Sequence, residues 1–306
     1  MKVSDLDIIF ISYDEPNAEI NWADLLSKAP WAQRVHGVKG SDNAHKAAAK
    51  LSNTEWLVTV DGDNQVRPAF FDIAFEELPA IEVYSWCGQN NINHLSYGNG
   101  GLKIWKKSFI EQMKTHEAAE SENAQVDFCW EKGYMNFPSV FSDTIINATP
   151  LQAWRAGFRE GVKMLTKNGV KVHKSLITKE IYWHNIHRLR IWSSVGAHVN
   201  NGLYAIYGAR LGTWLAYCTD WDYREVRDFD ILQGIYGQYV KPYVDDNDKG
   251  LVEEIKSLGE KIKLELGLNW AYFDKDQSEY ILDLYSESIS LGQTYYNKSP
   301  IWKNFS

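Results

Sequence analysis

The chain has 306 residues, 44% of them hydrophobic and 24% charged, which suits one large globular domain or a domain with a sizeable second part. A net charge of −8 argues against a uniformly basic nucleic-acid-binding protein. No run approaches the roughly 18 apolar residues of a membrane span, and residues 1–7 lack the apolar segment of a signal peptide. The cysteines are far apart and lack metal-ligand spacing, so we expect reduced thiols in a cytoplasmic protein. They are Cys87, Cys129 and Cys218.

Residues 6–65 predict an alternation of strands and helices. Apolar runs ended by polar residues or glycine predict strands at 6–13, 35–38 and 56–60. Between them we expect a short helix capped by Asn21 and a second helix at 43–51. Strand–helix–strand–helix–strand at these lengths is typical of a βαβαβ unit with a parallel sheet.

The pattern changes after this unit. Further strands are expected at 81–87, 102–106 and 137–141, with a helix at 108–116 and a Gly/Asn-rich loop at 89–101. Beyond Pro150 the chain looks mostly helical, at 150–167, 177–237, 249–267 and 276–290, with a linker-like break at 244–250. We therefore expect an α/β fold with a mixed, mostly parallel sheet at 1–148 and a mainly helical region at 149–306.

The charge is distributed unevenly. Residues 154–190 hold nine Lys and Arg against two Glu, a net charge of +7, so the rest of the chain carries about −15. A polyanion could bind to this segment, although a solvated helix face is the commoner meaning of such a run. Arg155, Arg159 and Lys163 recur at intervals of four residues and share one helix face.

The 56–60 strand ends in the tripeptide Asp61-Gly62-Asp63. Two carboxylates at this spacing can converge on one divalent cation, which commonly takes its remaining ligands from phosphates. Asp-Gly-Asp is also ordinary turn chemistry. Tyr13 and Lys39 follow the other two strands, and the carboxyl ends of parallel strands meet at the edge where ligands bind. That convergence favours a nucleotide-diphosphate site over a plain surface turn.

A nucleotide-binding βαβαβ half, a strand ending in Asp-Gly-Asp and a glycine-rich loop before a strand resemble the GT-A glycosyltransferases, over about residues 6–145. The segments 11–17, 35–40, 60–64, 152–163 and 194–203 are similar to glycosyltransferases of tailed phages. The resemblance implies transfer of a sugar from a nucleotide-sugar, a UDP-sugar above all, with Mn²⁺ or Mg²⁺. By analogy, the acceptor is 5-hydroxymethylcytosine in phage DNA, modified with arabinose or glucose in the host cell cytoplasm.

The resemblance also implies roles for single residues. Asp61 and Asp63 bridge the metal to the donor diphosphate, Gly62 lies close to the donor, and the end of the first strand holds base and ribose. The donor-binding set is Ser12, Tyr13, Asp14, Lys39, Asn43, Asp61, Gly62, Asp63 and Gly100. His45 and Lys46 are alternatives on the second helix, where a first-turn residue often faces solvent.

The catalytic base of inverting members is commonly a carboxylate after the glycine-rich loop, which here is Asp127. Val126 stands where the family has Glu, although Glu122 is near, and a retaining mechanism would need no such base. A histidine often completes the metal site, and His198 is our candidate, with His173, His184 and His187 as alternatives. For a single histidine, a structural role is the competing interpretation.

On the acceptor side we expect Trp86, Arg155, Arg159 and Lys163, with Asn99 in the glycine-rich loop. The basic stripe could meet the donor diphosphate or a DNA backbone, and a DNA base would have to be flipped out of its stack. Core packing is the alternative for Trp86. Other functions remain, namely transfer to a polysaccharide, lipid or protein, nucleotidyl transfer, and a non-catalytic sugar- or nucleotide-binding module. Intact Asp61 and Asp63 argue against the last of these.

Overall fold

The computed structural model describes residues 1–98, 100–113 and 133–290, except for the side chains of 285–290. The chain divides into two compact units, Met1–Ile146 and Asn147–Ser306. In the described part of the chain, no helix has the length and apolarity to cross a membrane. Cys87 and Cys218 form no disulfide, and Cys129 lies outside the described residues.

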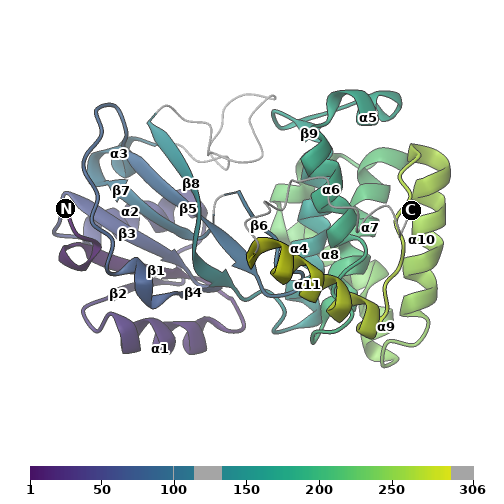
Figure 1. Cartoon of the computed structure of the whole chain (residues 1–306), viewed down its shortest axis with the longest axis horizontal. Coiled ribbons are helices and arrows are strands. Elements are labelled where there is room, and N and C mark those ends of the chain that lie inside the picture. Colours follow the sequence, from purple (N-terminus) through teal and green to yellow (C-terminus); the bar gives the residue numbers. More distant parts are fainter. Residues whose placement is uncertain (99, 114–132, 291–306) are drawn as a thin grey trace. The chain divides into compact units, whose positions relative to one another are not determined.

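The first unit is built on one mixed sheet (Figure 1). Its strands are β1 (Asp7–Ser12), β2 (Gln33–His36), β3 (Trp56–Asp61), β4 (Asn64–Val66), β5 (Val83–Asn90), β6 (Ser96–Tyr97), β7 (Leu102–Lys106) and β8 (Tyr134–Thr144). The order is β2-β1-β3-β7-β5-β8-β4, with β6 paired to β5. Strands β2, β1 and β3 are parallel, β7 runs antiparallel between β3 and β5, and β8 is parallel to β5. The predicted α/β fold with a mixed, mostly parallel sheet is confirmed.

Helices cover both faces of this sheet. Helix α1 (Ala18–Lys28) packs on one face through Leu25, while α2 (Ser41–Leu51) and α3 (Lys107–Gln112) pack on the other through Ala48 and Ile110. Because successive strand residues point to opposite faces, Ile8 and Phe10 join the first core and Ile9 the second. Short 3₁₀ turns at Val3–Asp5 and Pro68–Phe70 complete the unit.

The second unit is mainly helical, as predicted. Its helices are α4 (Pro150–Lys163), α5 (Ile177–Glu180), α6 (Trp183–Trp192), α7 (Gly202–Cys218), α8 (Phe229–Tyr239), α9 (Lys241–Asp245), α10 (Leu251–Leu266) and α11 (Lys275–Ser290), with 3₁₀ turns at Lys174–Leu176 and Tyr223–Arg227. The expected helix at 150–167 ends at Lys163 instead. A hairpin follows, formed by β9 (Thr166–Lys167) and β10 (Val170–Lys171), because Asn168 and Gly169 adopt the positive φ angles of a tight hairpin turn. The expected linker at 244–250 contains the end of α9.

Helices α4 and α7 form the closest helix pair of this unit. Four glycines each face a backbone carbonyl of the opposite helix, so a β-carbon there would clash with backbone: Gly157, Gly161, Gly208 and Gly212. The Thr213 hydroxyl donates to the Gly161 carbonyl at 3.0 Å across the pair. Small residues at intervals of four thus let the two backbones touch along their length.

One fully buried arginine ties several segments of this unit together. The Arg210 guanidinium on α7 donates to the carbonyls of Ser193 at 2.8 Å, Ile255 at 2.7 Å and Ala271 at 2.9 Å. Burial lowers the pKa of Arg210 to about 10, so the group stays charged at neutral pH. Its charge is stabilised by the dipoles of these carbonyls.

Candidate active site

The two central parallel strands end side by side. In the β1–β3 register Ile11 faces Asp61, so the loop after β1 and the turn after β3 share one edge of the sheet. A β-carbon on Gly62 would lie 2.7 Å from a Glu15 carboxylate oxygen and 3.0 Å from the Ser12 β-carbon. Glycine at position 62 therefore allows the first loop to close over the Asp61–Asp63 turn.

Hydrogen bonds hold this turn in place. The Asn21 side-chain amide donates to the Gly62 carbonyl at 3.0 Å, and Gln65 Nε2 donates to the Asn21 oxygen at 3.0 Å. The expectation that Asn21 caps the first helix is wrong, since α1 begins at Ala18 and Asn21 is buried inside it. The Asp63 carbonyl accepts from the Ile145 amide at 2.7 Å. The turn is thus held by Asn21 of α1 and by Ile145, which follows β8.

Two neighbouring carboxylates act on Asp63 at this edge. Burial, with the negative charges of Asp61 and Glu15, raises the pKa of Asp63 to about 7. The Asn64 side chain donates to the Asp63 carboxylate at 2.7 Å and opposes this rise in part. Glu15, which we did not predict, also accepts from the Tyr13 amide at 2.8 Å. The site therefore holds more negative charge than its own donors compensate.

Asp61 and Asp63 could supply part of the ligand set of a divalent cation. Among the described residues, no three His, Cys, Asp or Glu side chains form a metal-binding group. Mg²⁺ and Mn²⁺ prefer carboxylate oxygens, and Mg²⁺ is often held by one or two carboxylates together with water and substrate phosphates. Asp61 and Asp63 match that incomplete type of site. His198 lies in the second unit, so its role as a third ligand stays a prediction.

The glycine-rich loop lies against Asp61. The Asp61 amide donates to the Gly101 carbonyl at 2.8 Å, and a β-carbon on Gly101 would lie 2.7 Å from an Asp61 carboxylate oxygen. Gly100 is buried, and its amide donates to the Trp86 carbonyl at 2.9 Å. Lys103 donates from Nζ to the Gly100 carbonyl at 3.1 Å and is only 4% exposed.

A buried histidine shares the electrostatic field of Asp61 and Lys103. Burial lowers the pKa of His45, and the charge of Asp61 opposes that change. The His45 Nδ1 lies 2.8 Å from the Ser41 carbonyl, so a proton on this nitrogen makes the bond.

Lys103 was not predicted as a site residue, although a lysine at an inward position of an apolar strand is unusual.

The predicted base- and ribose-binding residues differ in accessibility. Ser12 is buried, and its hydroxyl accepts from Arg34 Nε at 2.9 Å and lies 3.0 Å from the His36 ring. Tyr13 is 47% exposed, and Asp14 is exposed beside it. Lys39 and Asn43 are also exposed, and the Asn43 amide donates to the Lys39 carbonyl at 3.2 Å.

The remaining predicted residues are spread over both units. Trp86 packs in the aromatic core between Phe70 and Phe137, which is the packing role weighed above. Arg155 and Arg159 on α4 place their guanidinium groups 4.5 and 5.5 Å from the Phe229 ring centre. Lys163 ends the same helix and is partly buried. Asp127, Glu122 and Asn99 lie outside the described residues.

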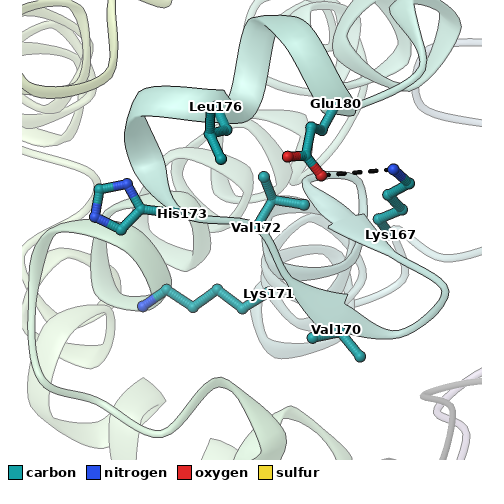
Figure 2. Close-up of a pocket in the computed structure, with 7 residues that line it drawn as sticks. All are labelled: Lys167, Val170, Lys171, Val172, His173, Leu176 and Glu180. Atoms are coloured by element: carbon teal, nitrogen blue, oxygen red, sulfur yellow. Dashed lines mark hydrogen bonds and ion pairs between the residues drawn. The ribbon is translucent and has the colours of Figure 1, made fainter.

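A surface pocket of about 230 Å³ lies in the second unit (Figure 2). It is lined by Lys167, Val170, Lys171, Val172, His173, Leu176 and Glu180. The Lys167–Glu180 ion pair at 3.5 Å crosses one side, and the His173 ring is engaged with the Ser175 hydroxyl at 2.9 Å. No predicted donor-binding residue lines it, and it is smaller than the roughly 300–1,000 Å³ of typical ligand pockets.

No protein-family model matches the sequence, and no curated protein sequence matches it. Some solved structures are similar to it. A glycosyltransferase involved in glycosylation of the major capsid of PBCV-1 is 14% identical, with 47% of this chain and 94% of that chain covered and a TM-score of 0.31. A Pyrobaculum calidifontis mannosyltransferase in complex with GDP-Man and Mn²⁺ is 12% identical, with 82% and 86% covered and a TM-score of 0.33.

A third similar structure is the 4-diphosphocytidyl-2C-methyl-D-erythritol synthase of Anaerococcus prevotii. It is 12% identical, with 44% of this chain and 89% of that chain covered and a TM-score of 0.27. At these identities and TM-scores the three similarities carry no argument about function. The proposed function therefore rests on the residues and the geometry of this chain.

Proposed function

We propose that the chain is a glycosyltransferase of the GT-A type, which moves a sugar from a nucleotide-sugar to an acceptor hydroxyl with the help of Mn²⁺ or Mg²⁺. The observation that carries this proposal is the convergence of Asp61, Asp63 and Glu15 where two parallel strands end. Burial and the neighbouring carboxylates raise the pKa of Asp63 to about 7, which marks negative charge that lacks compensation. A metal bound to a nucleoside diphosphate would supply that compensation.

In the reaction, an acceptor oxygen attacks the anomeric carbon while the bond from that carbon to the diphosphate breaks. The electron pair leaves with the nucleoside diphosphate, and a divalent ion held by Asp61 and Asp63 would neutralise the charge of this leaving group. Asp61 and Asp63 would hold the metal that positions the diphosphate end, and Gly62 allows the loop of Ser12 and Glu15 to approach these two carboxylates. Tyr13, which is exposed directly after β1, would stack on the base. Asp127 as the base that accepts the hydroxyl proton remains part of the proposal.

For the acceptor we propose 5-hydroxymethylcytosine in DNA, on the strength of the resemblance to tailed-phage glycosyltransferases. The +7 charge of residues 154–190 supports a polyanionic acceptor. The two arginines that stack on Phe229, itself 47% exposed, add a cationic aromatic surface within that unit. Transfer to a polysaccharide, lipid or protein hydroxyl and a non-catalytic binding module are the competing functions.

The test combines donor and acceptor panels. The protein is incubated with Mn²⁺, UDP-sugars that include UDP-arabinose and UDP-glucose, and DNA with or without 5-hydroxymethylcytosine. Released UDP and the DNA mass are then measured. We expect a sugar-sized mass gain on hydroxymethylated DNA alone. Release of UDP without DNA modification would overturn the DNA acceptor and keep the transferase, whereas no release with any nucleotide-sugar would overturn the transferase.

An Asp61→Asn variant tests the metal site. We expect it to lose at least about a hundredfold in turnover while it keeps its circular dichroism spectrum, since one carboxylate of the metal pair is gone. Asp24→Asn is the matched control, because Asp24 is partly exposed on α1 and pairs with Lys28 at 2.6 Å. Undiminished turnover in Asp61→Asn would contradict the proposed metal site.

A further inference from the structure

The beginning of α6 carries two exposed aromatic side chains beside partly buried histidines and arginines. Tyr182 is 62% exposed and Trp183 is 58% exposed, although large aromatic side chains usually lie inside. We call the group formed by Tyr182, Trp183, His184, His187, Arg188 and Arg190 the α6 patch. The later turns of the helix, labelled α6 in Figure 1, are anchored by Leu189, Ile191 and Trp192, which are buried. The exposed rings therefore project from a backbone that is held by its own core contacts.

The rings of the α6 patch are ordered relative to one another. Tyr182 and His184 stack with centroids 5.3 Å apart and planes 12° from parallel. Trp183 meets the edge of His184 at 5.9 Å and an angle of 82°. A ring pair held in this way presents a flat face without further loss of side-chain entropy, which favours stacking of another planar group.

The field around these rings is positive. Burial and the charge of Arg188 lower the pKa of His184. Burial and the charges of Arg190 and Arg188 lower that of His187 to about 4. Both imidazoles are thus neutral at pH 7, and the positive charge of the patch comes from its arginines. Lys179 is exposed shortly before the patch in the sequence.

We propose that the α6 patch binds single-stranded or locally unstacked polynucleotide, with bases stacked on Tyr182 and Trp183 and phosphates near Arg188 and Arg190. Aromatic platforms beside cations are the usual solution for this ligand, because each base has a π face. An anionic membrane would also match the charge. However, no aliphatic side chain of α6 is among the exposed large hydrophobic residues of the described chain, so little could insert between acyl chains.

This inference rests on the proposed function in one respect, since it gives a DNA acceptor its binding surface. A base that is to be modified has to leave its stack, and the patch would stabilise the unstacked strand. Binding itself requires no donor and no turnover. The surface can therefore be tested separately from the reaction.

The experiment measures fluorescence anisotropy of a labelled single-stranded dT20 oligonucleotide with the full chain at low salt. Replacing one stacking ring typically weakens such binding about fivefold or more. We expect Tyr182→Ala and Trp183→Ala each to show this, while Trp183→Phe binds nearly as well as the native chain. Tyr280→Ala is the matched control, because Tyr280 is 57% exposed on α11 beside the acidic residues Asp276 and Glu279. It should leave the affinity unchanged.

Three results would overturn the inference. One is dT20 affinity that the ring substitutions leave unchanged, and another is binding of blunt duplex DNA that is tighter than that of dT20 and independent of the rings. A third is ring-dependent binding to phosphatidylserine vesicles without binding to dT20. Asp61→Asn should retain dT20 binding. If the native chain binds dT20 through the rings but cleaves no nucleotide-sugar, the α6 patch stands and the proposed transferase falls.

Discussion

Protons and metal ions should compete for Asp63. If the pKa of Asp63 is about 7, metal binding must displace a proton below that pH. One competing proton with this pKa weakens the apparent affinity about tenfold between pH 8 and pH 6. We therefore expect Mn²⁺ to bind about tenfold more weakly at pH 6 than at pH 8.

Isothermal titration calorimetry with Mn²⁺ at both pH values, in buffers of different ionisation enthalpy, measures the affinity and the proton release together. Asp63→Asn should bind Mn²⁺ more weakly at pH 8 and lose most of the pH dependence. Asp24→Asn should behave like the native chain. Equal native affinity at pH 6 and pH 8, or an unchanged pH dependence in Asp63→Asn, would refute the assignment.

The same carboxyl group should affect stability without metal. Its pKa in the fold lies above the ordinary 3.8, so between these values the folded chain holds a proton that the unfolded chain has lost. The free energy of unfolding should therefore fall as pH rises from 4 to 7 and level off above. At 1.36 kcal/mol for each pKa unit, this loss of unfolding free energy is at most about 4 kcal/mol. Because Asp63 is partly exposed, we expect a loss of about 2 kcal/mol. Urea denaturation at pH 8 should accordingly find Asp63→Asn more stable than the native chain, and a less stable variant would contradict this reasoning.

Two further substitutions test contacts described above. Gly62→Ala should push the Glu15 carboxylate away, since the new β-carbon would lie 2.7 Å from it, and weaken Mn²⁺ binding several-fold with a stability change below about 1 kcal/mol. Calorimetry that finds native affinity in this variant would argue against the close approach of the two loops. Arg210→Met should lower the free energy of unfolding by about 3 kcal/mol, because it removes the hydrogen bonds from a buried charged group to the carbonyls of three segments. Urea denaturation measures this loss, and a neutral substitution would show that other donors reach these carbonyls.

The alternation of apolar runs was sufficient to predict the parallel core of the sheet. Strands β1 and β3 lie close to their predicted positions because buried parallel strands read as continuous apolar segments. Strand β2 begins and ends two residues before the predicted 35–38, because this edge strand has one buried residue. Strand β4 was missed, since three residues after a turn carry little periodicity. The hairpin after α4 was missed as well, although Asn168-Gly169 is a recognised hairpin turn signal.

For the candidate site, the sequence predicted the residues at strand ends but not the residues that position them. Asp61 and Asp63 follow a strand, so their location at the sheet edge is a matter of topology. Three residues that were not predicted as site residues contact this site or its loops. Glu15 lies against Gly62, Asn21 donates from α1 to the Gly62 carbonyl, and Lys103 donates from β7 to the Gly100 carbonyl. Such contacts depend on tertiary packing, which no local pattern records.

The glycine contacts between α4 and α7 give α4 two sides that differ in how well they should tolerate amino-acid substitution. On the side toward α7, Gly157 and Gly161 leave no space for even a methyl group. On the other side, Arg155, Arg159 and Lys163 are only partly buried and do not set the distance between the helices. A mutant library that randomises these three positions and retains the glycines would therefore test their proposed acceptor role on an unaltered helix pair.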